Sequence, residues 1–551
     1  MRSQGRIYIA AIIVGILSGL ICVCFRYAVA AISGLRPLLF NHSNPIIVHI
    51  AVFSSIFIAL LIVGWLVKKF PKISGSGLPQ TQALLFGRRV YNKPFKFLII
   101  KFIGGVLTLC SGLSLGREGT SVQMGSLTGY IAGNLLKVPE GKKRHLIAAG
   151  AGSGVSAAFT APLSSSILIM ESLQKVTITT TIICTLLAGG TAGIIAKLVT
   201  PYNIYDNIPV ELPKIGSWYL LVTFIVMALF FAFAGAMFSK MLIRGKGLYA
   251  SIREKMEKRS LLAGISGESL LLATVTWITG LFFTGMIGGD QSFLVKESTI
   301  ATYLHPGITG HPLLTTFINL LILASIIAII SSFTILSHSS GYPGGIFLPM
   351  MTIGGLLGKL FYDLTNFIST SLLPSGIGLF SEDVAGLGEN LSGYFIFIGM
   401  SAFFIAVVRT PITGFILISE MTGHYETFFP TLIVGILVYY LTQILKVEPL
   451  NDMLYEFMIK QDPQQPQRTV IYIDVEYGSY LYNKECANIL LPDGCSIVDI
   501  VRREKDGNGR WSNKKIPIGP HLVVKENDSI GIEVNSNEIE QLYRALASFG
   551  E

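Results

Sequence analysis

One acidic residue lies in the middle of an apolar part of the chain, where an ionised group is costly. Residues 112–125 read GLSLGREGTSVQMG, and the flanking segments 97–111 and 120–136 are largely apolar and carry no charge apart from Lys101. An ionisable side chain at membrane depth is expensive enough to suggest a function by itself. Glu118 is therefore the first candidate functional residue.

Glycines at 112, 116 and 119 surround this acid and allow the backbone to break. A broken helix inside a bilayer is tolerated only where it is buried in protein or lines a cavity. The helix that begins near Arg117 would present unpaired N–H groups, and such a helix end favours an anion. A deprotonated Glu118 and a small anion would then compete for one set of N–H donors, and protonation would release the side chain.

The same segment also contains a nucleophile pattern. GLSLG at 112–116 matches G-x-S-x-G, in which Ser114 would be the nucleophile. That motif needs a strand before it, a helix after it, and histidine and acid partners. The eight histidines are scattered and the motif lies between apolar segments. We therefore interpret the match as chance and do not predict an enzyme.

The composition places the chain among membrane proteins. It has 551 residues, of which 51% are hydrophobic and 14% charged. Several stretches, including 7–25 and 47–67, are long enough to span a bilayer. The net charge of +9 could suggest nucleic acid, but the basic residues are concentrated in short loops between apolar spans. None of the six cysteines has the spacing of metal ligands, so we predict no metal, no cofactor and no nucleic-acid partner.

Basic loops predict which side of the membrane each segment faces. Residues 68–96 include seven basic residues and no acid, and residues 137–144 are also basic. Because positive loops remain in the cytosol, both loops and the N-terminus are expected there. Within the first loop, GSGLP at 75–79 opens a short apolar helix, and Ser76 could cap that helix or face an ion. This motif alone favours the capping role.

Glycine recurs every four residues along the helix that follows Glu118. Gly125, Gly129 and Gly133 would lie on one face of that helix. A face of small residues lets two membrane helices approach closely. We expect this face to have a structural role.

The second half of the chain repeats the first. The glycines at 116, 125 and 129 recur with the same spacing at 345, 354 and 358. The segments 161–171 and 410–420 each place a proline nine residues before a glutamate, Glu171 or Glu420. The loop after the first glycine helix is basic, whereas the loop after the second is acidic at 382–389. We therefore expect repeats that are inverted across the membrane, with their helix ends meeting at the midplane.

These motifs resemble the CLC family of chloride channels and chloride/proton exchangers. GSGLP at 75–79, GREGT at 116–120 and GGIFLP at 344–349 occur in the family's order, and the resemblance covers residues 7–460. It implies a homodimer with one anion pathway in each subunit, and it places the gating glutamate on Glu118. The resemblance assigns chloride binding to Ser76, Gly119, Ile346 and Phe347. A serine rather than a proline in the first motif is similar to chloride-preferring members.

The chain departs from the family pattern at the inner end of the pathway. The inner proton-accepting glutamate of exchangers falls on Ser172, and the tyrosine that contacts the central ion falls on Asn451. Glu171 has a repeat counterpart in Glu420, which favours a shared structural role over proton transfer and leaves both roles open. Tyr455 could substitute for Asn451 only after a shift in helix register. These departures leave chloride selectivity intact, and they leave proton exchange and passive conduction as alternatives.

The composition changes after Lys460. Residues 461–468 form a polar, proline-bearing linker, and residues 469–551 contain short alternating apolar runs separated by turns. We predict a small soluble α+β domain, which resembles the C-terminal ligand-binding subdomain of RCK/TrkA regulators of potassium transport. Such subdomains dimerise, and some bind cyclic di-AMP. The residues expected at a ligand site are Ile500, Arg502, Arg503 and Pro517. The two arginines could hold phosphates or could instead form a charged strand edge.

The sequence therefore predicts an all-α polytopic membrane protein with an inverted-repeat CLC-type fold and broken helices in residues 1–460, followed by the soluble domain. We expect a multi-pass homodimer in the cell membrane, with the N-terminus and the C-terminal domain in the cytosol. The expected function is H+/Cl− antiport gated by Glu118 and regulated by the C-terminal domain, with chloride, protons and the lipid bilayer as partners. A passive chloride channel is the alternative, and a hydrolase that uses Ser114 is a distant one.

Overall fold

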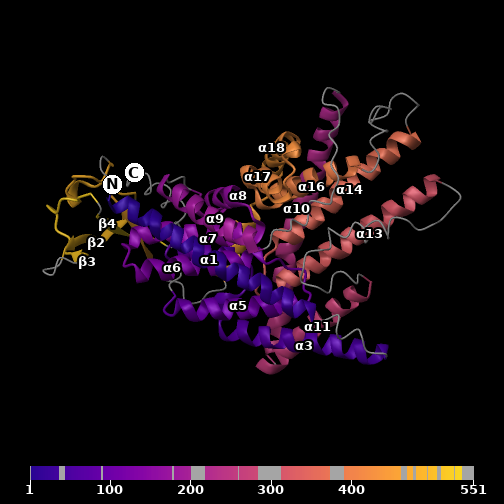
Figure 1. Cartoon of the computed structure of the whole chain (residues 1–551), viewed down its shortest axis with the longest axis horizontal. Coiled ribbons are helices and arrows are strands. Elements are labelled where there is room, and N and C mark those ends of the chain that lie inside the picture. The colour runs from indigo at the N-terminus through magenta and orange to yellow at the C-terminus, as the bar shows by residue number, and fades with distance from the viewer. Residues whose placement is uncertain are drawn as a thin grey trace.

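The computed structural model shows a helical body with a small β-sheet at one end, beside the N-terminus of the chain (Figure 1). It describes residues 2–35, 44–88, 91–175, 179–199, 218–258, 260–282, 312–372, 390–460, 468–475, 479–492, 494–505, 511–526 and 528–535.

Helices make up the body in both halves of the chain. The first half contains α1 (Arg2–Gly34), α3 (Pro45–Lys69), α4 (Leu78–Leu85), α5 (Pro94–Cys110), α6 (Glu118–Leu135), α7 (Glu140–Phe159), α8 (Pro162–Leu168) and α9 (Thr179–Val199). The second half contains α10 (Trp218–Glu257), α11 (Leu261–Phe282), α13 (Pro312–Ser339), α14 (Phe347–Leu372), α16 (Asn390–Val408), α17 (Pro411–Thr422), α18 (Phe428–Ile444) and α19 (Leu450–Lys460). In the described part of the chain, six helices have the length and apolar composition needed to cross a membrane.

Local sequence explains where several of these helices begin. The helices α5, α8 and α17 each start with proline, at Pro94, Pro162 and Pro411. Proline suits the first helical position because its missing N–H would have no partner there. The predicted spans 7–25 and 47–67 lie within α1 and α3, which confirms them as helices.

A break in the helical path occurs at the corresponding place in each half. The helix α6 begins at Glu118 after a break from α5, and α14 begins at Phe347 after a break from α13. Gly112 and Gly341 lie in these breaks with φ of 87° and 74°. Residues other than glycine rarely adopt such backbone angles. The broken helices predicted from the glycine pattern are therefore present.

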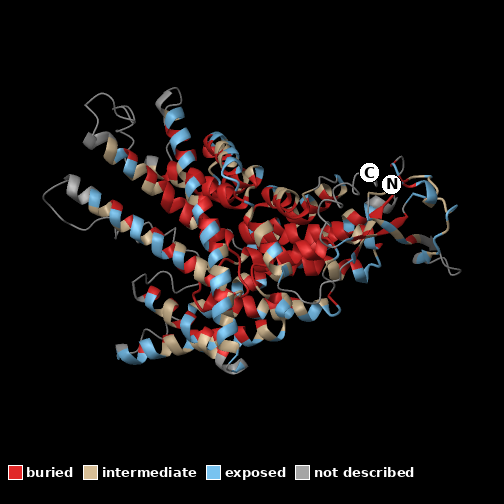
Figure 2. Cartoon of the chain, turned by 180° about the vertical axis from the view of Figure 1, so that it is seen from behind, coloured by how far each residue is buried: buried red, intermediate tan, exposed pale blue. Residues whose placement is uncertain are grey.

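The two halves also use the same close helix contact. A Cβ atom on Gly125 of α6 would lie 2.0 Å from the carbonyl oxygen of Gly150 on α7. In the second half, a Cβ atom on Gly354 of α14 would lie 2.7 Å from the carbonyl oxygen of Gly399 on α16. Buried residues gather in the middle of the helical body, and the outer helices carry many exposed ones (Figure 2). The mostly helical, polytopic fold class is thus confirmed.

The C-terminal part is a four-stranded antiparallel sheet. Its strands are β1 (Arg468–Asp474), β2 (Ser496–Lys505), β3 (Trp511–Ile516) and β4 (Ser529–Asn535), in the order β1-β4-β2-β3. In the central pairing, Ile471 of β1 and Ile497 of β2 both lie opposite Ile532 of β4. An irregularity follows Ile497 in β2. Alternating apolar residues of these strands form the inner face of the sheet.

The C-terminal domain has the short strands that the sequence predicts, and its residues 536–551 lie outside the described residues. Within 468–535, the described residues form strands and one 3₁₀ turn, Cys486–Asn488, so the helical part of an α+β domain is not found there. The first strand begins at Arg468, the last residue of the predicted linker, and the rest of that linker lies outside the described residues. The acidic loop at 382–389, on which the inverted orientation depends, also lies outside them.

The glycine face of α6 generates a stability prediction. A Cβ atom on Gly129 would lie 2.0 Å from the backbone carbonyl oxygen of Leu146, which cannot move without shifting α7. We expect Gly129→Ala to lower the free energy of unfolding by about 1–3 kcal/mol. Thermal unfolding of the purified protein in detergent measures the change. The matched control is Gly133→Ala, where the nearest atom is 3.1 Å away on the flexible side chain of Lys143. Equal melting temperatures for the two variants would contradict the proposed contact.

Candidate anion site

Backbone segments from both halves of the chain meet next to Glu118. Gly116 and Gly345 exchange both of their backbone hydrogen bonds, at 2.7 and 2.6 Å. The amide of Gly344 donates to the carbonyl oxygen of Gly75 at 3.4 Å, and the amide of Gly75 donates to the carbonyl oxygen of Gly341 at 2.7 Å. The three motifs that the sequence singled out are therefore joined directly, although they lie far apart in the chain.

Glycine is required at this meeting point because the segments approach so closely. A Cβ atom on Gly119 would lie 2.1 Å from the carbonyl oxygen of Ser76, and one on Gly77 would lie 2.4 Å from the carbonyl oxygen of Gly119. A Cβ atom on Gly345 would lie 2.4 Å from a carboxylate oxygen of Glu118. Any larger residue would push the backbone or the carboxylate away.

The Glu118 carboxylate lies at the N-terminus of α14, a helix of the other half. Its Oε1 atom accepts a hydrogen bond from the amide of Leu348 at 3.2 Å, and the amide of Phe347 also hydrogen-bonds the carboxylate. The side chain is 1% exposed, and its Oε2 atom has no hydrogen-bond partner among the described residues. The acid of one broken helix thus occupies the positive end of the other.

The neighbouring arginine does not neutralise this carboxylate. Arg117 donates instead to the carbonyl oxygen of Ala158, near the end of α7, at 3.2 Å. None of the ion pairs within the described segments involves Glu118. The negative charge is therefore stabilised by neutral backbone dipoles, as an anion would be at the same place.

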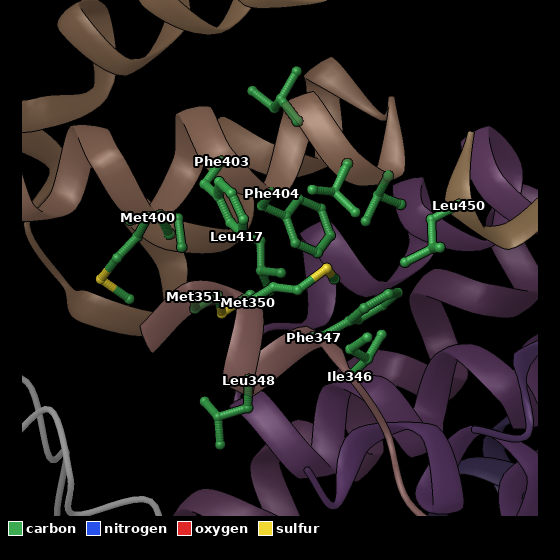
Figure 3. Packing of buried hydrophobic residues seen from close by; sticks show 14 of the residues in the cluster. Ile346, Phe347, Leu348, Met350, Met351, Met400, Phe403, Phe404, Leu417 and Leu450 are labelled. Atoms are coloured by element: carbon green, nitrogen blue, oxygen red, sulfur yellow. The ribbon is translucent and has the colours of Figure 1, made fainter. Parts of the chain in front are cut away.

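Apolar packing fixes the start of α14. Ile346 and Phe347 are both fully buried, and the ring of Phe347 meets that of Phe404 edge to face, with 5.1 Å between ring centroids. Figure 3 shows Ile346 and Phe347 side by side at the beginning of this helix, with Leu450 of α19 nearby. The amide of Ile346 donates no hydrogen bond within the described residues. A rigid helix end with a free amide can hold an anion without a cationic side chain.

Ser76 does not cap a helix, so the role that its motif alone favoured is wrong. The N-cap of α4 is Gly77, with φ of 91° and no hydrogen bond from a capping side chain. Ser76 precedes it, is 3% exposed, and its hydroxyl makes no hydrogen bond to a described residue. A serine hydroxyl carries one donor, which can bind an anion or a water molecule.

Lys101 is a site residue that the sequence reasoning missed. Its ammonium group is fully buried and donates to the carbonyl oxygens of Ile73 and Gly75, both at 2.8 Å. These bonds hold the backbone just before Ser76. The available signal was that Lys101 is the one charged residue in 97–111.

Two residues at the inner positions bond to each other. The side-chain amide of Asn451 donates to the hydroxyl of Ser172, both side chains are buried, and Asn451 Oδ1 has no partner among the described residues. Neither residue hydrogen-bonds to Glu118. Tyr455 does not take the place of Asn451, because its ring packs on Phe86 with 6.3 Å between centroids. The shift in helix register that we considered is absent.

Glu171 and Glu420 form reciprocal helix caps. Glu171 accepts from the amides of Ile412 and Thr413 at the start of α17, at 3.2 and 2.8 Å. Glu420 accepts from the amides of Leu163 and Ser164 at the start of α8, at 2.9 and 2.8 Å. Because each carboxylate uses both oxygens on the other's helix, this geometry favours the shared structural role over proton transfer.

Ser114 has partners that do not suit a nucleophile. Its hydroxyl lies 2.8 Å from the hydroxyl of Thr334, and its amide donates to the hydroxyl of Ser337 at 3.2 Å. A nucleophilic serine needs a histidine or another base in this place. The segment also follows α5, a helix, and not the strand that the motif requires.

The residues expected at a ligand site in the sheet domain differ in their burial and in their partners. Arg502 makes two hydrogen bonds to Asp528, at 2.8 and 2.7 Å, a pairing that the sequence did not predict. Ile500 is fully buried in the core, whereas Pro517 is exposed. The backbone of Arg503 pairs with Asn513 in the sheet, and its side chain lies outside the described residues.

Comparison with known proteins gives one consistent family. The sequence model of the family described as "Voltage gated chloride channel" matches residues 58–443. The "H(+)/Cl(-) exchange transporter ClcA" of Vibrio campbellii is 30% identical over 472 residues, covering 83% of this chain and 90% of the relative. The protein of the same name from Citrobacter koseri is 29% identical over 473 residues, covering 84% and 91%.

Solved structures show the same fold. A slow cyanobacterial Cl−/H+ antiporter, at 24% identity, matches 83% of this chain and 99% of its own with a TM-score of 0.66. A eukaryotic CLC transporter, at 15% identity, matches 98% of this chain and 94% of its own with a TM-score of 0.65.

The reciprocal caps generate a second prediction. Glu171→Ala and Glu420→Ala each leave two amides at the start of a helix without their acceptor. We expect each substitution to lower the free energy of unfolding by about 1–2 kcal/mol, measured by thermal unfolding in detergent. The control is Glu426→Ala, because Glu426 is exposed. A capping role would be excluded if both variants had the same melting temperature as the control.

Proposed function

The chain belongs to the voltage-gated chloride channel family, and we propose that it exchanges chloride for protons across a membrane. The observation that carries the proposal is the Glu118 carboxylate on the first amides of α14, where a chloride ion would otherwise bind. A single titratable group that competes with the anion links proton binding to anion binding. The curated relatives that match most of this chain carry the name of H+/Cl− exchange transporters, which supports the proposal.

The proposed chloride site contains neutral donors. We assign to it the Ser76 hydroxyl, the amides of Ile346 and Phe347, and the backbone at Gly119. The amide of Phe347 now hydrogen-bonds the Glu118 carboxylate. Such donors can replace the hydration shell of chloride without trapping the ion as a cation would. A deprotonated Glu118 closes the site, and protonation weakens its hold on the amides so that chloride can enter.

Proton access from the inner side is proposed to pass by Ser172 and Asn451. The unpaired Oδ1 atom of Asn451, buried next to a hydroxyl, is suited to bind water. A passive chloride channel is the second candidate. The observation that favours it is that the inner position is a serine, while the neighbouring carboxylate of Glu171 is held in a helix cap.

We propose that the chain is a homodimer in the cell membrane. Apolar side chains remain exposed on α8, α17 and α18, including Leu163, Ile412 and Phe429 at 47%, 47% and 70%. These helices are neighbours in the structure, and a second copy would cover them. The N-terminus lies beside the sheet domain in both views, which supports placing both on one side, the cytosol (Figures 1 and 2).

Regulation by the sheet domain is also a proposal. The support for it is the direct contact of the sheet with α4 and α7. Binding of cyclic di-AMP stays a prediction, in which Arg502 would bind phosphate while it is also bonded to Asp528.

The third prediction tests the gate. We expect Glu118→Gln to abolish the pH dependence of chloride flux and all coupled proton movement, because a neutral amide does not titrate. Chloride and proton fluxes are recorded together from liposomes that contain the purified protein. Glu426→Gln is the control and should behave as the wild type. Flux in Glu118→Gln that still varies with external pH would show that Glu118 is not the gate, and wild-type chloride flux without proton movement would establish the channel.

The fourth prediction concerns selectivity. Removing the Ser76 hydroxyl deletes a donor that favours the smaller and more strongly hydrated anion. We expect Ser76→Pro to raise the ratio of nitrate to chloride flux by about threefold or more. Ser76→Ala removes the hydroxyl without constraining the backbone and should change the ratio in the same direction. Unchanged ratios in both variants would remove Ser76 from the anion site.

A further inference from the structure

Two helices reach from the proposed ion pathway to the sheet domain. The helix α4 begins next to Ser76 at the anion site, and α19 carries Asn451 at its start. Phe86 directly follows α4, and Tyr455 lies one helical turn beyond Asn451. The rings of these two aromatic residues meet edge to face.

Phe86 and Tyr455 are buried in the core of the sheet domain. We call this the docking cluster; its fully or nearly fully buried members are Ala83, Phe86, Tyr455, Ile471, Ile473, Val475, Leu481, Ile489, Ile500, Val524, Ile530, Ile532 and Val534. Phe86 is 3% exposed and Tyr455 is 4% exposed. The sheet therefore does not have a closed core of its own, since the membrane helices complete it.

The sheet also contacts the helical body outside the docking cluster. A Cβ atom on Gly87 would lie 3.3 Å from the carbonyl oxygen of Val470 in β1, so the end of α4 touches the first strand. At the start of α7, the amide of Gly141 donates to the hydroxyl of Ser529 in β4 at 3.2 Å. The sheet is thus fixed against both α4 and α7.

The helix α4 is suited to transmit a movement of the sheet domain to the backbone at Ser76. All eight of its residues are buried, so it cannot tilt without moving its neighbours. Its eight residues span about 12 Å at 1.5 Å per residue, which is little more than two helical turns. The docking cluster and Ser76 therefore lie at the two ends of one short helix. A displacement at Phe86 would therefore reach the Ser76 backbone.

We propose that Phe86 and Tyr455 are positioning residues of the ion pathway, through which the sheet domain sets the geometry at Ser76 and Asn451. The inference rests on the proposed chloride transport. The sheet domain is then part of the transport structure, and anything that shifts it changes how the anion is bound. A purely structural role would lower the amount of folded protein without changing the ion preference of the protein that remains.

The test uses Phe86→Ala and Tyr455→Ala in the full-length chain. The control is Leu490→Ala, because Leu490 lies in the sheet domain and is 78% exposed. Folded protein is selected by size-exclusion chromatography and placed in liposomes. The chloride concentration for half-maximal flux and the ratio of nitrate to chloride flux are then measured per folded protein. We expect one or both quantities to change by about two- to thirtyfold in the two variants and to stay at the wild-type value in the control.

Other outcomes separate the two proposals. Wild-type protein without chloride flux would contradict the proposed function itself. Wild-type flux with both quantities unchanged in Phe86→Ala and Tyr455→Ala would overturn the positioning role alone. If Phe86→Ala does not fold, it is replaced by Phe86→Leu, which retains an apolar side chain. The positioning role would also be overturned if the chloride concentration for half-maximal flux and the flux ratio were unchanged in Phe86→Leu and Tyr455→Ala.

Discussion

Amides at the start of a buried membrane helix need an acceptor, because the bilayer core offers no water to bind them. In this protein the acceptors are carboxylates supplied by the opposite half of the chain. Glu118 serves α14, Glu171 serves α17 and Glu420 serves α8. The caps of α8 and α17 use both oxygens of each acid, whereas Oε2 of Glu118 has no partner in the part of the chain that the structure describes. That difference separates the two acids that each hold two helices together from the acid that we propose as the gate.

The cations near the site bind carbonyl oxygens and do not bind the acid. Lys101 donates to the backbone before Ser76, and Arg117 donates to the end of α7. They raise the positive potential and fix the backbone, while the donors that we propose for the anion are amides and a hydroxyl. An anion held in this way is bound weakly enough to move on.

Residue types and spacing predicted the broken helices and the internal repeat, because glycine has few structural explanations in such a place. They also singled out Glu118, whose carboxylate lies at the start of α14. The role of Ser76 could not be read correctly, since a serine before a short helix has the same pattern whether or not it caps. Lys101 and the roles of Phe86 and Tyr455 depend on contacts between segments far apart in the chain. Arg502 has a partner, Asp528, that lies 26 positions away and that no motif indicated.

The central claim is that chloride and the Glu118 carboxylate occupy the same helix ends. It is tested most directly by crystals of Glu118→Gln grown in bromide, examined by anomalous scattering at the bromine edge. The account predicts a bromide peak at the position that the Glu118 carboxylate takes in the wild type, within hydrogen-bonding distance of the amides at the start of α14. A map with no peak there, in crystals that show bromide elsewhere in the pathway, would contradict it.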